Sequence, residues 1–103
     1  MRNMKVRIRR HTLLQDAVGL TMTAVLLAEH RDAAADDEPG RLMTLQYRGP
    51  IADEHGLTVM TERLMSIREG DDVDVKVIEK TLPAVGPTRH IRKLMEIAPI
   101  PLD

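Results

Sequence analysis

The strongest candidate for catalytic chemistry in this sequence is the loop Asp53-Glu54-His55, which lies between Pro50 and Gly56. A histidine beside carboxylates could act as a general base, because imidazole changes its charge near neutral pH. No nucleophile accompanies this histidine in a motif, and polar surface loops commonly have the same composition. We therefore expect a solvated loop here and a chain that is not an enzyme.

Two clusters could offer ligands to a metal ion. One comprises His30, Asp32, Asp36, Asp37 and Glu38, and the other comprises Asp71, Asp72 and Asp74. Their order does not follow a calcium-binding loop. The sequence also contains neither a zinc motif of the His-Glu-x-x-His type nor a glycine-rich phosphate loop. The chain has no cysteine, which excludes thiolate zinc sites and disulfide frameworks. We predict that it holds no metal and no cofactor.

Positively charged side chains gather near both ends of the chain and could bind an anion or a nucleic acid. Arg7 and Arg9 fall on one face of a predicted strand. Near the other end, Arg89, Arg92 and Lys93 fall at the start of a predicted helix, whose exposed N–H groups favour anions. The whole chain has a net charge of −1, and no aromatic residues alternate with these cations for base stacking. A strand edge guarded by charge is therefore the alternative interpretation of the N-terminal group.

The first half of the chain must position the N-terminal cations. Alternation of apolar and basic residues predicts a half-buried strand from Met4 to Arg10. Thr12 and Gln15 then match a helix capping box. Apolar residues at spacings of three and four follow, which predicts an amphipathic helix that frays between His30 and Ala35. A strand from Leu20 to Leu26 is the alternative, because β-branched residues weaken this helix.

The second half positions the remaining candidates. The segment from Leu42 to Arg48 is typical of a strand, and the valine alternation from Val73 to Lys80 predicts another. Between them, apolar spacing predicts a helix from Leu57 to Ile67 that ends before Gly70, with a strand as the alternative. A last amphipathic helix is predicted from Arg89 to Ile97.

Together these elements predict an α/β fold in the order strand, helix, strand, helix, strand, helix. We expect one compact domain over residues 1–97, followed by a proline-rich arm at residues 98–103. If the segment from Leu57 to Ile67 is extended, the fold becomes α+β, with an antiparallel meander from Leu42 to Lys80 after the first helix.

The sequence predicts a non-enzymatic protein-interaction module, such as a small adaptor, inhibitor or assembly subunit. The chain has seven Met, one Tyr and neither Phe nor Trp, and methionine-rich surfaces adapt to partners. The apolar residues Ile97, Ile100 and Leu102 of the arm would dock on a protein partner or on a second copy of the chain. The alternative function is nucleic-acid or anion binding, through a basic strand and a basic helix that share a face.

The composition also predicts where the protein acts. The absence of cysteine favours an intracellular, cytoplasmic location. The apolar run from Ala17 to Ala28 is shorter than the roughly 20 residues that span a bilayer. Charged residues from Glu29 to Asp32 follow this run, which excludes a secretory cleavage region. We expect no contact with a membrane.

Overall fold

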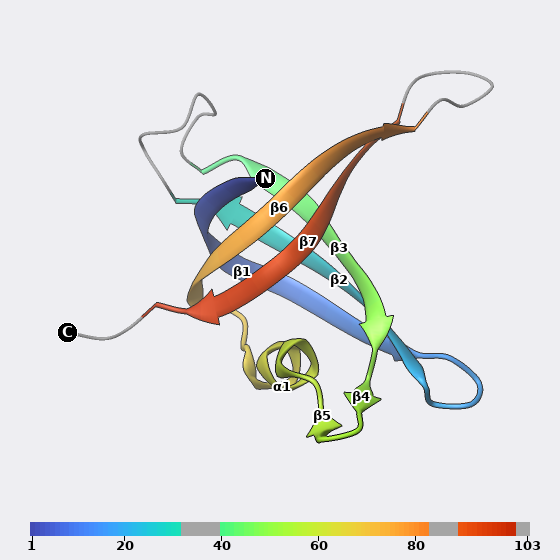
Figure 1. Ribbon diagram of the computed structural model, residues 1–103. Helices are drawn as coiled ribbons and strands as arrows, with labels where there is room; N and C mark the ends of the chain where they lie inside the picture. The colour runs from blue at the N-terminus through green and yellow to red at the C-terminus, as the bar shows by residue number, and fades with distance from the viewer. Residues whose placement is uncertain (32–39, 83–88, 101–103) are drawn as a thin grey trace.

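The computed structural model describes residues 1–31, 40–82 and 89–100, with the backbone alone for residues 81–82 and 89–90. Within these residues the chain is mostly β-structure, and its long strands close into a barrel (Figure 1). Around the barrel the strands follow the order β1-β2-β3-β7-β6, and β6 pairs with β1. The barrel strands are β1 (Arg2–Gln15), β2 (Thr21–His30), β3 (Leu42–Pro50), β6 (Asp72–Leu82) and β7 (Arg89–Pro99).

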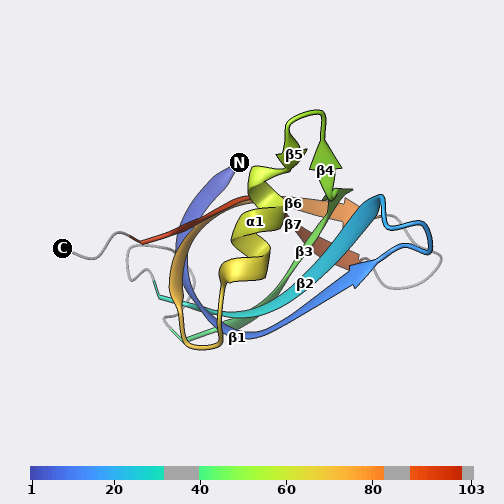
Figure 2. The ribbon, with the colours of Figure 1, turned by 90° about the horizontal axis from the view of Figure 1, so that it is seen from below.

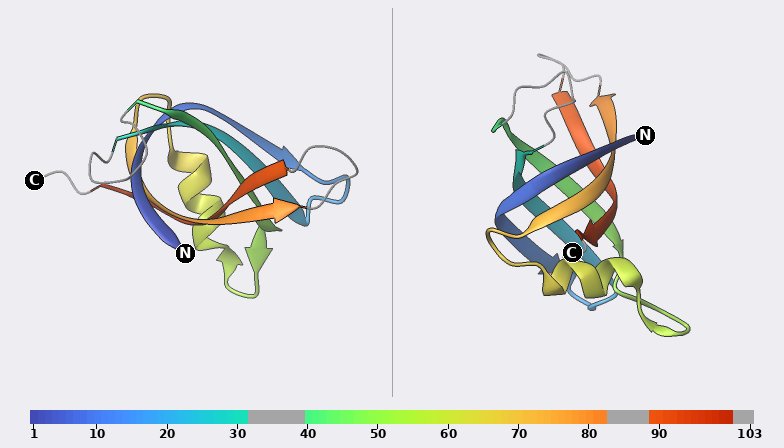
Figure 3. Two further views of the ribbon diagram at one scale, coloured as in Figure 1. Left: turned by 90° about the horizontal axis from the view of Figure 1, so that it is seen from above. Right: turned by 90° about the vertical axis from the view of Figure 1, so that its left-hand side faces the viewer.

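The connection from β3 to β6 carries three short elements. β4 (Ala52–Asp53) and β5 (Gly56–Leu57) form a small antiparallel hairpin, and the helix α1 (Val59–Ser66) follows it. The helix lies across one end of the barrel, which is seen from below in Figure 2 and from the side in the right-hand view of Figure 3. Because Thr61 and Leu64 of α1 are buried, the helix closes that end of the core.

The pairing that closes the barrel between β3 and β7 is short. These two strands run parallel, whereas the other neighbouring strands pair antiparallel. Their contact consists of two residue pairs, Leu45 with Arg92 and Gln46 with Lys93. β6 reaches its place beside β1 by the long connection through α1, so β6, β1, β2 and β3 have Greek-key order.

Alternation along the strands places one set of side chains inside the barrel. In β1 the buried residues include Met4, Val6 and Ile8, as the sequence predicts. A register shift between Ile8 and Arg10 then leaves both Arg9 and Arg10 exposed. Valine forms the inner face of β6, also as predicted, and its buried residues are Val73, Val75 and Val77.

The α/β prediction is wrong, and the largest difference concerns the segment that follows Thr12. Instead of forming an amphipathic helix, this segment completes β1, turns at Gly19 and returns as β2. The strand alternative for Leu20 to Leu26 agrees with β2. Gly19 has a φ of 73°, which suits a turn, and β-branched residues in the stretch favour a strand. Pairing with β1 on one side and β3 on the other then satisfies the backbone of β2.

The second predicted helix is confirmed, and the third is wrong. α1 forms within the predicted range from Leu57 to Ile67, and the hydroxyl of Thr58 accepts the N–H of Thr61 at 3.1 Å as the N-cap. The alternative α+β fold, with a meander from Leu42 to Lys80, is therefore wrong too. Residues 89–97 belong to β7, because hydrogen bonds to β6 along the strand, and to β3 at Arg92 and Lys93, take the place of helical hydrogen bonds.

The remaining strand predictions agree with the structure. The predicted strands from Leu42 to Arg48 and from Val73 to Lys80 fall within β3 and β6. β7 continues past residue 97, the predicted domain boundary, and Ala98 pairs with Asp74. Of the predicted arm, residues 98–100 are described, and Leu102 lies outside the described residues.

Candidate binding surfaces

The N-terminal cations predicted to bind anions are paired with carboxylates. Arg7 donates to Asp72 of β6, from Nε to Oδ1 at 2.9 Å and from Nη2 to Oδ2 at 3.3 Å. This hydrogen bonding lowers the pKa of the Asp72 carboxyl and raises the pKa of Arg7. Arg9 forms an ion pair with Glu29 of β2. The two cations of the predicted basic strand are therefore already neutralised by neighbouring strands.

The structure also separates the predicted cations near the C-terminus, because Arg92 is paired with a carboxylate and Lys93 is not. The Nε of Arg92 lies 3.4 Å from Oε1 of Glu79 on β6, and the same oxygen lies 4.0 Å from Nη1 of Arg2. β6 thus places a carboxylate between the cations of β1 and those of β7. The side chain of Arg89 lies outside the described residues. Among the described residues, Lys93 has no carboxylate partner, and it joins a different set of cations.

Lys93 lines a groove of about 170 Å³ on the outer side of the contact between β3 and β7. Arg48 of β3 and Lys80 of β6 line the same groove, and neither has a carboxylate partner in the described part of the chain. The hydroxyl of Thr23 and the amide of Gln46 add neutral hydrogen-bonding groups. We call this site the cation groove, and it comprises Thr23, Gln46, Tyr47, Arg48, Lys80, Ile91 and Lys93.

The cation groove has the charge of an anion-binding site. Its three cationic side chains come from three strands, and none of its lining residues is acidic. Sequence reasoning identified Lys93 but missed Arg48 and Lys80. The alternation of β3 does place Gln46 and Arg48 on one face. Their proximity to Lys93, however, depends on the parallel contact between β3 and β7, for which the sequence gives no local signal.

Tyr47, the sole aromatic residue of the chain, lies half-buried at the cation groove. Burial raises the pKa of its phenol above the ordinary value of 10.0. The ring lies close to Gly49, because a Cβ atom at that position would be 2.7 Å from Cζ of Tyr47. Alternation along β3 directs the side chain of Tyr47 to the face opposite Gln46 and Arg48, and its ring packs against the core.

A second surface is the hairpin between β1 and β2, which presents apolar side chains to solvent. Leu14, Val18 and Leu20 are 57%, 72% and 69% exposed. The turn is ordered by its own hydrogen bonds: the N–H of Leu20 donates to Oδ1 of Asp16 at 2.8 Å, and the N–H of Gly19 donates to the Asp16 carbonyl at 3.1 Å. The bond from Leu20 is the main reason that the pKa of the Asp16 carboxyl is lowered.

This hairpin is tied to the segment around β4 and β5. The N–H of Ile51 donates to the carbonyl of Leu20 at 3.0 Å, and the N–H of Thr58 donates to the carbonyl of Ile51 at 3.1 Å. Both segments lie at the end of the barrel that carries α1 (Figure 1). Leu57 of β5 and Val59 of α1, which follow Ile51 in the chain, are also exposed, at 49% and 60%. We call the exposed set Leu14, Val18, Leu20, Leu57 and Val59 the apolar end.

The remaining sequence candidates lie apart from these two surfaces. His55 and Glu54 face each other at 3.4 Å with 84% of each side chain exposed, so they form a solvated turn. Ile97 is 1% exposed and belongs to the core, whereas Ile100 lines a groove beside α1. The described residues contain no group of three acidic or histidine side chains that could hold a metal ion. In the described part of the chain, no helix has the length and apolar character needed to cross a membrane.

No family model, curated protein or solved structure matches this chain. The class of the fold therefore follows from its topology. A five-stranded Greek-key barrel is the architecture of the OB fold. Barrels of that class bind oligonucleotides or oligosaccharides on the face of their second and third strands, but one architecture hosts many functions. Thr23, Gln46 and Arg48 of the cation groove lie on β2 and β3.

Proposed function

We propose that the protein is a non-enzymatic interaction module that docks on a protein partner through its apolar end. The observation that supports this proposal is the exposure of Leu14, Val18 and Leu20 on a hairpin whose turn is fixed by hydrogen bonds. Exposed apolar side chains that lie together commonly mark interaction sites. A preorganised hairpin also loses little conformational entropy when it binds. The cytoplasmic location and the role of Leu102 stay predictions.

Two matched double variants test the apolar end. Val18→Thr with Leu20→Gln removes apolar surface from the hairpin, whereas Val25→Thr with Leu42→Gln makes the same changes at exposed positions of β2 and β3. Each purified variant is used to capture partners from a native lysate, with mass spectrometry of the bound proteins. We expect the hairpin variant alone to lose the partner that the unaltered protein recovers. Equal recovery by both variants would show that the apolar end is not the docking surface.

A second candidate function is the binding of single-stranded nucleic acid or another polyanion in the cation groove. It is supported by Arg48, Lys80 and Lys93, which surround the groove without carboxylate partners among the described residues. Because the net charge of the chain is −1, attraction of a polyanion would depend on a local group of cations such as this one. Three phosphate contacts on a single strand predict that log K falls with log salt with a slope of about −2.

The test uses a labelled oligodeoxynucleotide and fluorescence anisotropy at several salt concentrations. Replacing the three groove cations by Gln should weaken binding and flatten the salt dependence. The control replaces Lys5, Arg10 and Arg68 by Gln, which removes the same charge from exposed positions elsewhere. If both triple variants bind with the affinity of the unaltered protein, the cation groove is not a polyanion site.

A further inference from the structure

The three cations of the cation groove lie on one diagonal line across three neighbouring strands. Gln46 of β3 pairs with Lys93 of β7, and Ile91 of β7 pairs with Lys80 of β6. Because β3 and β7 run parallel, Arg48 lies two residues ahead of the level of Lys93, and Lys80 lies two residues behind it on the other side. The cations therefore follow a line from β3 over β7 to β6.

The spacing along this line suits a chain of anionic groups better than a single anion. Neighbouring strands lie about 4.8 Å apart and two residues advance a strand by about 6.6 Å, so each diagonal step is on the order of 8 Å. Convergence of the three side chains on one compact anion would bring like charges together and cost side-chain entropy. A chain of anionic groups instead meets Arg48, Lys93 and Lys80 in turn.

Neutral hydrogen-bonding groups flank the line of cations. The strand register places Thr23 beside Arg48 and Gln46 beside Lys93. A hydroxyl and an amide can both donate to phosphate oxygens, as can lysine and arginine. None of the residues that line the groove is acidic. The groove therefore offers donors along its length and no carboxylate that would repel a phosphate.

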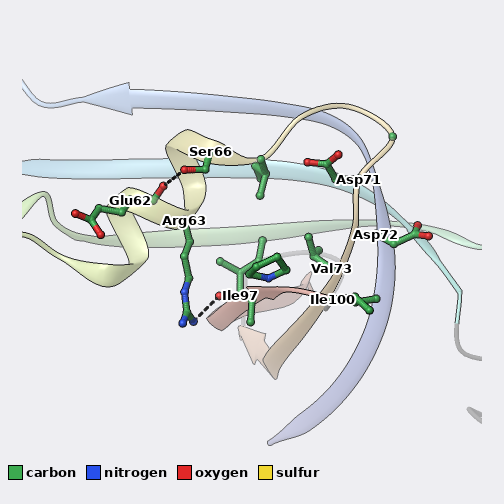
Figure 4. A pocket seen from close by; sticks show the side chains of 12 residues that line it. Glu62, Arg63, Ser66, Asp71, Asp72, Val73, Ile97 and Ile100 are labelled. Atoms are coloured by element: carbon green, nitrogen blue, oxygen red, sulfur yellow. Dashed lines mark hydrogen bonds between the residues drawn. The ribbon is translucent and has the colours of Figure 1, made fainter. Parts of the chain in front are cut away.

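The largest groove in the described structure, of about 760 Å³, has a different charge (Figure 4). Its lining includes the carboxylates of Glu62 and Asp71, which have no ion-pair partner in the described part of the chain, and one basic side chain, Arg63. Figure 4 shows Arg63 reaching from α1 toward β7, where its Nη1 donates to the carbonyl oxygen of Ile97 at 2.8 Å. This groove therefore does not suit phosphate, and the two grooves select different ligands.

The cation groove holds no group that is prepared to recognise a base. The ring of Tyr47, the sole aromatic residue, packs against the core on the opposite face of β3 and offers no stacking surface. Gln46 and Arg48 could contact base edges, but specific readout uses bidentate contacts of defined geometry. In the described part of the chain, no hydrogen bond holds either side chain in place.

The size of the groove also argues against an enclosed base. Its volume of about 170 Å³ is below the roughly 300–1,000 Å³ of pockets that enclose a small organic molecule. Bases on a bound strand would therefore stay outside the groove, and the phosphates would make the contacts.

We infer that the cation groove binds a linear chain of phosphate groups, such as the backbone of single-stranded nucleic acid, without recognising bases. The chain runs from Arg48 over Lys93 to Lys80. The inference rests on the second candidate function and narrows it, because binding becomes independent of base sequence. Release of counterions from the contacted phosphates supplies the affinity.

Three labelled twelve-residue probes test this inference with the full protein and fluorescence anisotropy. The first is oligothymidylate. The second has an abasic residue at each position, so it keeps the phosphates and lacks the bases. The third is a methylphosphonate oligothymidylate, which keeps the bases and lacks the backbone charge. We expect the abasic probe to bind within about twofold of oligothymidylate, and the methylphosphonate probe to bind at least about tenfold more weakly.

The outcomes separate the inference from the function on which it rests. A loss of about fivefold or more with the abasic probe, the effect of one stacked base, would overturn the inference and leave nucleic-acid binding intact. If none of the probes binds, both fail. Unlabelled linear polyphosphate identifies the source of the phosphates. Its displacement of a bound abasic probe would support recognition of any phosphate chain, whereas no displacement would support recognition of the nucleic-acid backbone alone.

Single variants test the diagonal line. Arg48→Gln, Lys93→Gln and Lys80→Gln should each reduce the slope of log K against log salt by about 0.7, because each removes one phosphate contact. The control Arg68→Gln removes the same charge from an exposed position elsewhere and should leave the slope unchanged. An unchanged slope in Arg48→Gln or Lys80→Gln, the two ends of the line, would refute the linear path.

Discussion

Replacement of His30 by leucine should stabilise the protein. His30 ends β2, pairs with Val6 of β1 and is 0% exposed. Among the described residues, neither of its ring nitrogens has a hydrogen-bond partner. A neutral imidazole has one donor and one acceptor, so burial removes water from two polar groups without compensation. Leucine has a comparable size and no polar atom, and it would remove this cost.

The size of the effect can be bounded. A buried polar group without a partner costs about 1–3 kcal/mol, and imperfect repacking after a hydrophobic replacement offsets up to about 1.5 kcal/mol. Two such groups in His30 cost about 2–6 kcal/mol together. We therefore expect His30→Leu to raise the free energy of unfolding by at least about 0.5 kcal/mol, even with the largest repacking offset. In a domain of this size, each 1 kcal/mol corresponds to a rise in Tm of about 4–8 °C. Urea unfolding followed by circular dichroism, together with a thermal scan, measures both quantities.

The matched control is His55→Leu, because His55 is 84% exposed and its replacement should change stability by no more than about 0.5 kcal/mol. A loss of stability in His30→Leu, with no change in the control, would refute the reasoning. It would show that the ring of His30 has a hydrogen-bond partner, such as an ordered water, that the replacement removes.

Three further perturbations test other parts of the molecule. Gly49→Ala should destabilise the fold by about 1–3 kcal/mol and shift the fluorescence of Tyr47, because the new Cβ would overlap the ring; unchanged fluorescence would contradict this. The Asp16 carboxylate should stabilise the β1–β2 turn above about pH 4 and lose this effect as pH falls through its lowered pKa. The amide shift of Leu20 should follow that titration, and Asp16→Asn should abolish it. Leu64→Ala should cost about 2–5 kcal/mol in urea unfolding, whereas Met65→Ala at an exposed position should be nearly neutral; equal effects would contradict a buried face on α1.

Local patterns predicted the strands whose two faces differ clearly. In β1 and β6, apolar side chains alternate with charged or polar ones, so the buried face could be assigned without knowledge of the fold. They also predicted α1, where apolar spacing agreed with helix-forming residues. They failed for β2 and β7. In those segments the apolar spacing also fits a helix, and pairing with two neighbouring strands decided the outcome.

The binding surfaces were less predictable than the strands. Arg7, Arg9 and Arg92 formed a plausible anion site when the sequence was considered alone, but carboxylates from adjacent strands pair with each of them. Of the predicted cations, Lys93 lies in the cation groove with Arg48. Ion pairs between strands depend on register, and register is a property of the sheet rather than of any single segment.

By itself the sequence determined which faces of β1 and β6 are buried, where α1 forms, and that cysteine chemistry is absent. The tertiary structure alone decided that β6 lies beside β1 and that Gln46 meets Lys93. It also placed α1 beside the end of β7, where Arg63 donates a hydrogen bond to the carbonyl of Ile97. The physical reason is that alternation and capping act over a few residues, whereas strand order depends on hydrogen bonds between segments far apart in the chain.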